Sequence, residues 1–481
     1  MAAEKIEIVM NRRINTVLIT AAIIFLLILF RLIPDSLYGS TYPALRFCGG
    51  AREVGGSCYM LEVDDSTSLL VDCGAMSDAG LDILPPEPEG IDFMILTHAH
   101  SDHCGLIPEL FQAGFSGRVY CASPTDQLVP VMLGMARSFK KERVPRQIYD
   151  IAISSITGVE FNEYIKINNI SFRFLRAEHL LGAASVEVLL RGEEDTTRVL
   201  FSGDLGAGNS VLLPPPEICP RADYVVMEST YGGRVREEDP REGRERFASS
   251  VAAALRRGGD VLIPAFTLGR TQEIISVLEI YRRKGLIPSG TIFYSDSPTA
   301  RRISDIYRKN ISSFDRTASE GGYLETSALR EVRSRSSLPV HKRKHSPAVF
   351  ISSSGNLQHA NSPRHLMRIF ADSRNLLCLV GWQPPRSLGR RLQNGEDPVL
   401  VRYSEKGRYH RKWISPALEI RSFSCFSGHA DQNGLLEWLG AVEGVKKVFL
   451  IHGEYGQAGK LKNKITGPEV AIPERGERIA L

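Results

Sequence analysis

Residues 96–106 read LTHAHSDHCGL. Within six positions this stretch carries four side chains of metal-ligand type, namely His98, His100, Asp102 and His103. The apolar run at residues 93–96 before them predicts a buried strand, and residues 105–111 after them have the spacing of a helix start. The four side chains are therefore expected on a strand-to-helix loop, where a rigid sheet can aim them.

Imidazole and carboxylate groups together suit zinc, and two adjacent groups of such ligands could serve two ions. The alternative is an ordinary polar loop with surface histidines. Chance disfavours it, because the whole chain has eleven histidines and three of them fall in this one loop. The loop alone therefore indicates a zinc site.

Length, composition and charge are compatible with many kinds of globular protein. The 481 residues, 43% hydrophobic and 24% charged, allow two or three hydrophobic cores in an ordinary globular protein. A net charge of +4 neither demands nor excludes a nucleic acid partner. None of the eight cysteines forms a C-x-x-C pair, which favours buried thiols in a reducing compartment over a disulfide framework.

The amino terminus has a different composition. Seventeen uncharged residues separate Arg13 from Arg31, which is the lower limit for a membrane span if Arg31 snorkels to the interface. We expect a single-pass anchor and linker at residues 1–44, with a signal peptide or a mis-called start codon as open alternatives. The three basic residues before the run favour an outward catalytic domain, whereas the free cysteines favour a cytoplasmic one, and we expect the latter.

Two kinds of region follow along the chain. Strands dominate residues 57–72, around an Asp-Asp-Ser turn, and helices appear first at residues 103–113 and 124–142. From residue 242 onward, helix and apolar strand alternate through residue 371. Repeated βα units of this kind predict a parallel-sheet domain that is inserted before the chain returns near residue 420.

Four isolated residues follow apolar strands and could complete the metal site: Asp72, His179, Asp204 and His452. One such residue alone more often caps a loop. Four of them, each at or just past the end of a strand, favour convergence on one site.

In this order, Asp72, the H-x-H-x-D-H loop, His179 and Asp204 resemble the metallo-β-lactamase superfamily. Further segments are similar to its β-CASP branch of ribonucleases, which includes the cleavage-and-polyadenylation endonuclease subunit, its archaeal relatives and ribonuclease J. These segments are ESTYG at residues 228–232, PAFTLGRTQE, DSPTA, ISSSGN, LGRRL, FSGHAD with His429, and IHGE with His452. The resemblance runs from about residue 45 to the end.

The resemblance implies an α/β fold, a metallo-β-lactamase αββα sandwich with an inserted β-CASP parallel-sheet domain. Residues 45–231 would form the first part of the sandwich, 232–420 the β-CASP domain, and 421–481 the completion of the sandwich. The resemblance also implies two Zn²⁺ ions, the first held by His98, His100 and His179, and the second by Asp102, His103 and His452. Asp204 would bridge the ions, and Asp72 would orient the loop without binding metal.

The expected chemistry is hydrolysis of an RNA phosphodiester by two-metal hydroxide attack. By the resemblance, Asp102 also serves catalysis, His429 donates the proton that the leaving oxygen needs, and Glu228 holds the other ring nitrogen of His429. Candidate phosphate contacts are Arg270, Ser353, Gly389 and Arg390, although each could equally be structural. The chain departs from its relatives at residues 358–360, QHA, and residues 381–385, GWQPP, both on the expected substrate side.

The leading hypothesis is therefore a zinc-dependent ribonuclease of RNA processing or decay, acting as an endonuclease, a 5′-exonuclease or both. The alternatives are a DNA nuclease, an ester or thioester hydrolase, and a non-catalytic scaffold. His452 favours RNA over DNA by the resemblance, the inserted domain argues against a small ester, and the complete ligand set argues against a scaffold. The expected partners are RNA, a membrane through the anchor, and, as an open alternative to a monomer, a second copy of the chain.

Overall fold

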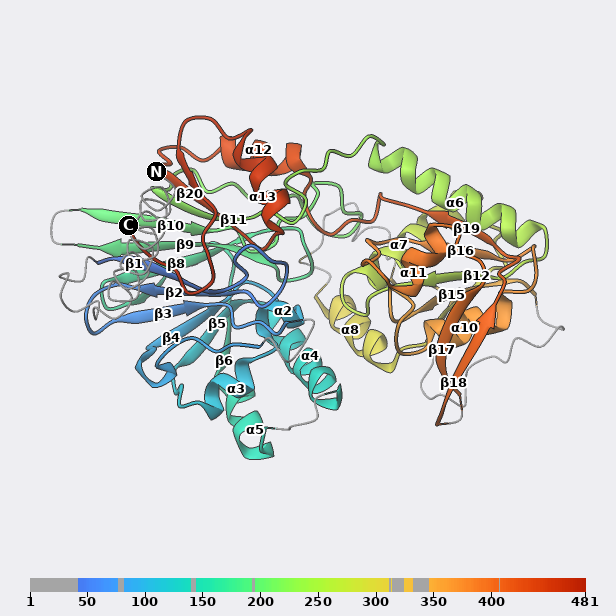
Figure 1. Cartoon of the computed structure of the whole chain (residues 1–481), viewed down its shortest axis with the longest axis horizontal. Coiled ribbons are helices and arrows are strands. Elements are labelled where there is room, and N and C mark those ends of the chain that lie inside the picture. Colours follow the sequence, from blue (N-terminus) through green and yellow to red (C-terminus); the bar gives the residue numbers. More distant parts are fainter. Residues whose placement is uncertain are drawn as a thin grey trace, which may run out of the picture.

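The structure is a computed structural model that describes residues 42–76, 82–139, 144–192, 195–310, 313, 324–331, 346–405 and 407–481. Three main sheets make up the described chain, and Figure 1 shows two of them packed together on one side and the third beside them. The packed pair holds strands from both ends of the chain, because residues near the carboxyl end return to it. The third sheet lies between these two portions in sequence.

The first sheet has the order β22-β1-β2-β3-β4-β5-β6. Strands β3 to β6 are parallel to one another, and the others pair antiparallel. Their bounds are β1 Ala44–Gly49, β2 Cys58–Glu62, β3 Ser68–Val71, β4 Phe93–Leu96, β5 Arg118–Ala122, β6 Ile156–Val159 and β22 Arg478–Ala480.

The second sheet has the order β21-β20-β11-β10-β9-β8-β7. Strands β10, β11, β20 and β21 are parallel, and β7 to β10 are antiparallel neighbours. Their bounds are β7 Ile165–Ile167, β8 Ile170–Arg176, β9 Ala184–Arg191, β10 Thr196–Phe201, β11 Tyr224–Glu228, β20 Lys447–Ile451 and β21 Glu469–Ala471.

One hydrophobic core lies between these two sheets. Side chains of both inner faces meet in it, as in the stacked pair Phe93–Phe172 with ring centroids 5.6 Å apart and the tilted pair Phe47–Phe449 at 5.4 Å. All four residues of β4 are buried, as the uninterrupted apolar run predicts for a parallel strand covered on both faces. The sheets are thereby fixed face to face.

Helices cover the outer faces of the pair, which gives the four layers of an αββα sandwich (Figure 1). Helices α2 to α5 lie on the side of the first sheet, and α12 and α13 on the side of the second. Their bounds are α2 Ser101–Cys104, α3 Ile107–Gln112, α4 Thr125–Phe139, α5 Arg146–Ser154, α12 Gln432–Gly440 and α13 Tyr455–Lys462, and a 3₁₀ turn spans Pro88–Gly90.

The third sheet is parallel throughout and has the order β14-β13-β15-β12-β16-β19. Its strands alternate with helices, as the repeated βα units predict. Strand bounds are β12 Val261–Pro264, β13 Ile292–Ser295, β14 Leu329–Glu331, β15 Ala348–Ser352, β16 Leu376–Leu379 and β19 Glu419–Ser422. Helix bounds are α6 Pro240–Arg256, α7 Arg270–Arg283, α8 Pro298–Lys309, α10 Ser362–Ile369 and α11 Leu388–Gln393, and a hairpin of β17 Val399–Glu405 and β18 Arg408–Ile414 follows α11.

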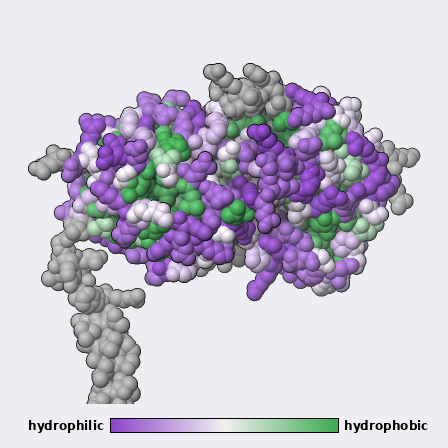
Figure 2. All heavy atoms as spheres, turned by 90° about the horizontal axis from the view of Figure 1, so that it is seen from above, coloured by the Kyte–Doolittle hydropathy of each residue, from purple (hydrophilic) through white to green (hydrophobic). Residues whose placement is uncertain are grey.

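The predicted fold class is confirmed, with local differences. The single helix expected at residues 103–113 is two short helices, because Gly105 and Leu106 separate α2 from α3, which begins with Ile107 and Pro108. Near residue 420, where the chain is expected to return to the sandwich, β19 pairs with β16 of the third sheet through Ser422. The exact domain boundaries stay a prediction. Figure 2 shows a mostly hydrophilic surface with scattered apolar patches over the described parts.

The expectation of a membrane anchor is corrected. The apolar run at residues 14–30 lies outside the described residues, and across the described chain no helix is long and apolar enough to cross a bilayer. Seventeen uncharged residues only reach the lower limit of a span, so hydropathy alone was weak support. The membrane partner and the membrane-anchored, cytoplasmic placement predicted from this run are therefore withdrawn.

Candidate metal centre

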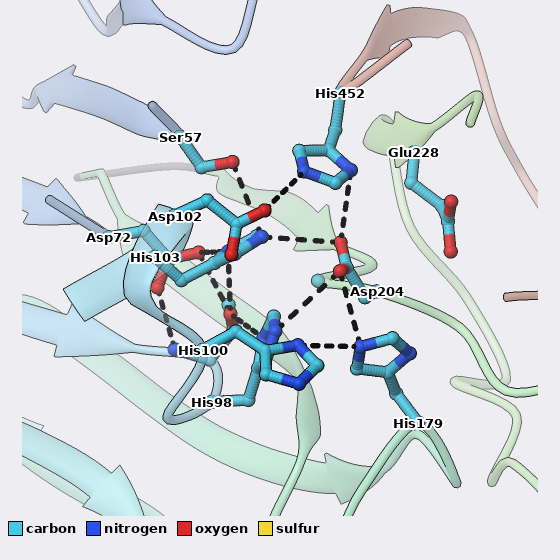
Figure 3. Close-up of polar contacts among 12 residues, drawn as sticks. Ser57, Asp72, His98, His100, Asp102, His103, His179, Asp204, Glu228 and His452 are labelled. Atoms are coloured by element: carbon cyan, nitrogen blue, oxygen red, sulfur yellow. Dashed lines mark hydrogen bonds and ion pairs between the residues drawn. The ribbon is translucent and has the colours of Figure 1, made fainter. Parts of the chain in front are cut away.

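The candidate ligands reach one place because each follows the end of a strand in one of the two packed sheets. His98 follows β4, Asp204 follows β10 and His452 follows β20, each within three residues of the last strand residue. His179 follows β8 by the same short distance along the chain. The loop predicted from the sequence adds three more side chains at the start of α2, which are His100, Asp102 and His103. Figure 3 shows them gathered around Asp204.

The first group of possible ligand atoms contains His98, His100, His179 and Asp204, and all its atoms lie within 4.8 Å of one another. Nε2 of His98 lies 3.6 Å from Oδ2 of Asp204, and Nε2 of His179 lies 3.4 Å from the same oxygen. Nδ1 of His100 is 3.0 Å from Nε2 of His179. These atoms converge on one small volume beside Oδ2.

The second group contains Asp102, His103 and His452. Nε2 of His452 lies 3.5 Å from Oδ2 of Asp102. Nε2 of His103 and Nδ1 of His452 lie 3.4 and 3.3 Å from Oδ1 of Asp204. Asp204 therefore faces the first group with one carboxylate oxygen and the second group with the other, as a bridging ligand would.

Burial and charge set the protonation of these side chains. Burial lowers the pKa of His98 and His179, and it lowers the pKa of His100 to about 4, so the neutral imidazoles keep a lone pair free for a metal. Burial disfavours charge on His103 as well, but the carboxylates of Asp204 and Asp72 outweigh it and raise the pKa of His103.

Three buried polar atoms in the two groups have no hydrogen-bond partner among the described residues. They are Nε2 of His98, Oδ1 of Asp204 and Nε2 of His452. Unpaired buried polar atoms are costly, and native proteins satisfy nearly all of them. The donor set therefore fits bound cations, which would satisfy all three atoms at once.

Asp72 holds the loop without facing either group of ligand atoms. Its Oδ2 accepts a hydrogen bond from Nδ1 of His103 at 2.7 Å and one from Oγ1 of Thr97 at 2.8 Å, and its Oδ1 accepts from the Thr97 backbone N–H at 2.8 Å. The bond to Nδ1 orients the His103 ring so that Nε2 faces Asp204, with the Ser57 hydroxyl 3.4 Å from the same nitrogen. This arrangement is the one expected for an orienting residue.

Thr97 and Thr230 were not among the predicted site residues. The hydroxyl of Thr230 donates to the backbone oxygen of His452 at 2.8 Å and lies 3.1 Å from its Nδ1. Along the chain, Thr97 directly precedes His98, and Thr230 follows Glu228 by two residues. That adjacency was the one signal available, and it is weak because most threonines beside a strand end only cap a turn.

Glu228 and His429 form a second pair beside the ligand cluster. Nδ1 of His429 lies 3.1 Å from both carboxylate oxygens of Glu228, which also accepts the Leu205 N–H at 2.7 Å. Burial opposes charge on His429, but the carboxylates of Glu228 and Asp204 outweigh it and raise its pKa to about 9. His429 is thus a charged imidazole near neutral pH.

A small pocket, partly open to solvent, adjoins this cluster between the sandwich and the inserted domain. Arg270, the first residue of α7, lines it together with His179 and Gly428. Two buried acids that sequence reasoning missed also line it: burial raises the pKa of Glu178 to about 7, and burial likewise raises the pKa of Glu273. Both accept hydrogen bonds from the 208–211 segment, which they hold in place.

Ser353, Gly389 and Arg390 make contacts within the inserted domain. The backbone oxygen of Ser353 accepts hydrogen bonds from the backbone N–H groups of residues 361 and 362. The backbone N–H of Gly389 donates to the backbone oxygen of Asn356 at 3.2 Å. The Arg390 guanidinium donates to the oxygen of Gln383 through Nε and Nη2 at 2.9 and 2.7 Å. The structure brings Arg270 to the metal-ligand cluster and gives the other three residues these internal hydrogen bonds; their role as phosphate contacts stays a prediction.

Comparison with known families agrees with this architecture. The Metallo-beta-lactamase superfamily matches residues 51–265, the Beta-Casp domain matches residues 271–392, and the Zn-dependent metallo-hydrolase RNA specificity domain matches residues 414–473. A crystal structure of a protein of unknown function from Enterococcus faecalis covers 91% of this chain and all of its own, with a TM-score of 0.56 and 14% identity. That likeness concerns the fold alone.

Three relatives match over most of the chain. Ribonuclease TTHA0252 of Thermus thermophilus is 32% identical over 90% of this chain and 98% of its own. Transcription termination factor FttA of Methanocaldococcus jannaschii is 32% identical over 86% of this chain and 68% of its own, and an RNase J-like protein of the same organism is 29% identical over 86% and 93%. The chain belongs to the β-CASP branch of the metallo-β-lactamase superfamily. The fold implies that it binds divalent metal, for which three overlapping groups in this cluster are candidate sites, one of them made of Asp204, Glu228, His429 and His452.

Proposed function

We propose that the protein is a zinc-dependent ribonuclease that hydrolyses RNA phosphodiester bonds and leaves a 5′-phosphate and a 3′-hydroxyl. One observation carries the proposal: a histidine and carboxylate cluster built around Asp204 lies beside a charged His429. The relatives named as ribonucleases support RNA as the substrate.

Two Zn²⁺ ions fit the two groups of ligand atoms, with Asp204 shared between them. The donors are nitrogen and oxygen atoms without thiolates, which suits zinc in a catalytic site. Bound in pairs, such ions supply a water of lowered pKa as nucleophile and neutralise charge on the phosphate oxygens. His98, His100 and His179 would hold the first ion, and Asp102, His103 and His452 would hold the second.

His429 supplies what the ions do not, which is a proton for the leaving oxygen of the RNA strand. Glu228 accepts at Nδ1 of His429, so Nε2 is the nitrogen left to donate. A pKa of about 9 keeps that proton in place near neutral pH until the oxygen develops charge. Glu228 acts through His429 by fixing its orientation.

Arg270 is suited to hold a substrate phosphate at the mouth of this site. Among the described residues its guanidinium has no hydrogen-bond or ion-pair partner in the protein, although burial lowers its pKa. The planar fork of an arginine matches phosphate oxygens. A phosphate held there would lie beside His179 and Gly428, in the pocket that leads to the ligand cluster.

The experiment is timed digestion of one RNA labelled at either end, with and without a chelator. We expect cleavage that the chelator abolishes and that added zinc restores, and the two labels report the cleavage mode. His98→Ala should abolish cleavage, whereas Asp64→Ala, at an exposed turn, should not. Cleavage that survives both the chelator and His98→Ala would sink the proposal, and faster hydrolysis of a chromogenic ester than of RNA would point to another substrate.

A further inference from the structure

Two large aromatic side chains are exposed at the carboxyl edge of the inserted parallel sheet. Phe266 follows β12 by two residues with 54% of its surface exposed, and Trp382 follows β16 by three residues with 40% exposed. These two strands are direct neighbours. In open parallel sheets, ligands bind at the carboxyl ends of the strands. Exposed rings at this edge have no part in the hydrophobic core and are free to contact a ligand.

Contacts join the loop that carries Phe266 to the loop that carries Trp382, through the loop between β15 and α10. The ring of Phe266 lies against Gly355, since a Cβ built on that glycine would be 3.2 Å from its Cε2. Gly355 follows β15, which pairs with β12. The side-chain amide of Gln383, next to Trp382, donates to the oxygens of Gly355 and Gly381 at 3.1 and 3.0 Å. The loops after β12, β15 and β16 are thereby joined.

Hydrogen bonds from Gly389 and Arg390 hold these loops together. Arg390 donates twice to the oxygen of Gln383, and Gly389 donates to the oxygen of Asn356, so α11 fixes the loops on either side of it. Their hydrogen bonds to the protein give Phe266 and Trp382 a rigid support. A rigid support lowers the entropic cost of binding a flexible ligand.

The surface is continuous with the metal-ligand cluster. The hydroxyl of Thr271 donates to the backbone oxygen of Phe266 at 2.6 Å, which links the loop that carries Phe266 to the start of α7. Arg270 precedes Thr271, and its Nη2 lies 3.6 Å from the place of a Cβ on Gly428. The oxygen of Gly428 in turn accepts from Nδ1 of His179 at 2.6 Å. A strand held at the ligand cluster could therefore extend past Arg270 onto the rings.

Charge on these loops suits a polyanion. Residues 265–270, 353–361 and 381–390 contain three arginines, Arg270, Arg386 and Arg390, and no aspartate or glutamate. Arg386 is exposed and follows Trp382 by four residues in the same loop. Separate rings among arginines are the pattern with which proteins bind single-stranded nucleic acid, in which bases stack on the rings and phosphates pair with the charges. An apolar protein partner would leave Arg270 and Arg386 without counter-charges.

We propose that Phe266 and Trp382 form a stacking platform for the bases of single-stranded RNA that extends from the cleavage site. This inference rests on the proposed ribonuclease function and adds the part of the substrate that the metal-ligand cluster does not hold. It assigns single strands as the preferred form, because a paired base has no free face to stack on a ring. The platform binds and positions RNA and takes no part in bond breaking.

The test measures binding of labelled RNA with phosphorothioate linkages, which resist cleavage, by fluorescence anisotropy at 4, 8 and 12 nucleotides. For the wild-type protein the dissociation constant should fall as the strand grows. Phe266→Ala and Trp382→Ala should each raise the dissociation constant for the 12-mer by roughly tenfold and flatten the dependence on length. Trp382→Phe, which keeps a ring, should restore most of the affinity, whereas Phe266→Leu, which keeps only apolar contact with Gly355, should not.

Trp413→Ala is the matched control, because Trp413 is 61% exposed on β18 of the separate hairpin and should leave the binding constants unchanged. Thermal unfolding of each variant reports whether it is folded. Binding of the 12-mer that stays within about twofold of wild type in folded Phe266→Ala and Trp382→Ala would overturn the platform. Parallel digestion of unmodified RNA separates the two proposals, since loss of metal-dependent cleavage in the wild type would contradict the ribonuclease and not the binding result.

Discussion

The metal-ligand cluster of the sandwich and the aromatic edge of the inserted sheet are both built from loops at strand ends, yet they carry opposite kinds of side chain. The cluster buries histidines and carboxylates, three of whose atoms have no hydrogen-bond partner among the described residues. The aromatic edge exposes Phe266 and Trp382 among arginines. Bond breaking needs fixed, desolvated ligands, whereas holding a strand needs accessible faces. The two regions should therefore respond differently to mutation.

The largest effect is expected for Asp204→Ala, since its two oxygens face both groups of ligand atoms. Losing them should remove metal from both groups and lower RNA cleavage by several orders of magnitude. Metal content by mass spectrometry and kcat on labelled RNA give the two readouts. If Asp204→Ala keeps its metal and its cleavage rate, the metal-ligand cluster is no more sensitive to mutation than the exposed aromatic residues are.

His429→Ala should lower kcat on the order of 10²- to 10⁴-fold, which is the usual contribution of a general acid. The metal content should not change, because His429 is paired with Glu228 and is not among the proposed ligands. Comparing kcat with metal content separates proton donation from metal binding. Loss of metal in this variant would move His429 into the ligand set.

The pH dependence should follow the charge on His429. With its pKa raised to about 9, His429 carries the proton below that pH and loses it above, so the rate should fall on the alkaline side near pH 9. Glu228→Gln removes the largest charge that raises this pKa, so the fall should move to lower pH. Profiles of kcat from pH 6 to 10 for both proteins check this. If kcat of Glu228→Gln falls at the same alkaline pH as kcat of the wild type, the pairing of Glu228 with His429 is contradicted.

Asp72→Asn should weaken metal binding about 10- to 100-fold without removing a ligand. Asp72 fixes His103 and Thr97 by three hydrogen bonds, and the amide cannot accept all of them. Competition with a coloured chelator measures the affinity, and Asp64→Asn at an exposed turn serves as the control. Equal metal affinities for Asp72→Asn and Asp64→Asn would contradict an orienting role for Asp72.

The smallest effects concern two arginines. Arg270→Ala should raise the KM for RNA by about tenfold, the size expected for a lost charge-assisted hydrogen bond to phosphate. Arg390→Ala should instead lower the free energy of unfolding by about 1 kcal/mol, because its guanidinium bonds to the oxygen of Gln383. Kinetics and thermal unfolding of both variants distinguish the roles, and a larger KM effect for Arg390 would reverse them.

The cluster was predictable from sequence because residue type and position carried the signal. His98 to His103 stand together, and Asp204, His179 and His452 each follow an apolar strand, so the sandwich brings distant residues to one edge. The loop edge that carries Phe266 and Trp382 was predictable only in part, because residues 381–385 were expected on the substrate side but their place beside Phe266 was not expected. Phe266 and Trp382 sit in apolar contexts that resemble core segments, and only the sheet order shows that their strands are neighbours.

Buried acids and special backbone contacts were also beyond the sequence. Glu178 and Glu273 lie far apart along the chain and meet only through the 208–211 segment. Gly389 and Arg390 matched a phosphate-binding pattern, yet their hydrogen bonds to Asn356 and Gln383 are internal. Local residue type cannot tell whether a donor faces a ligand or the protein, because that depends on tertiary packing.

The central claim is that a two-ion centre around Asp204 cuts RNA, and zinc titration of chelator-treated protein tests it most directly. Each addition would be followed by measuring bound zinc and the rate of RNA cleavage in the same sample. The account predicts that cleavage rises with zinc and stops rising at two equivalents per chain, with no recovery in Asp204→Ala. Full cleavage without bound zinc, or zinc binding that never restores cleavage, would contradict it.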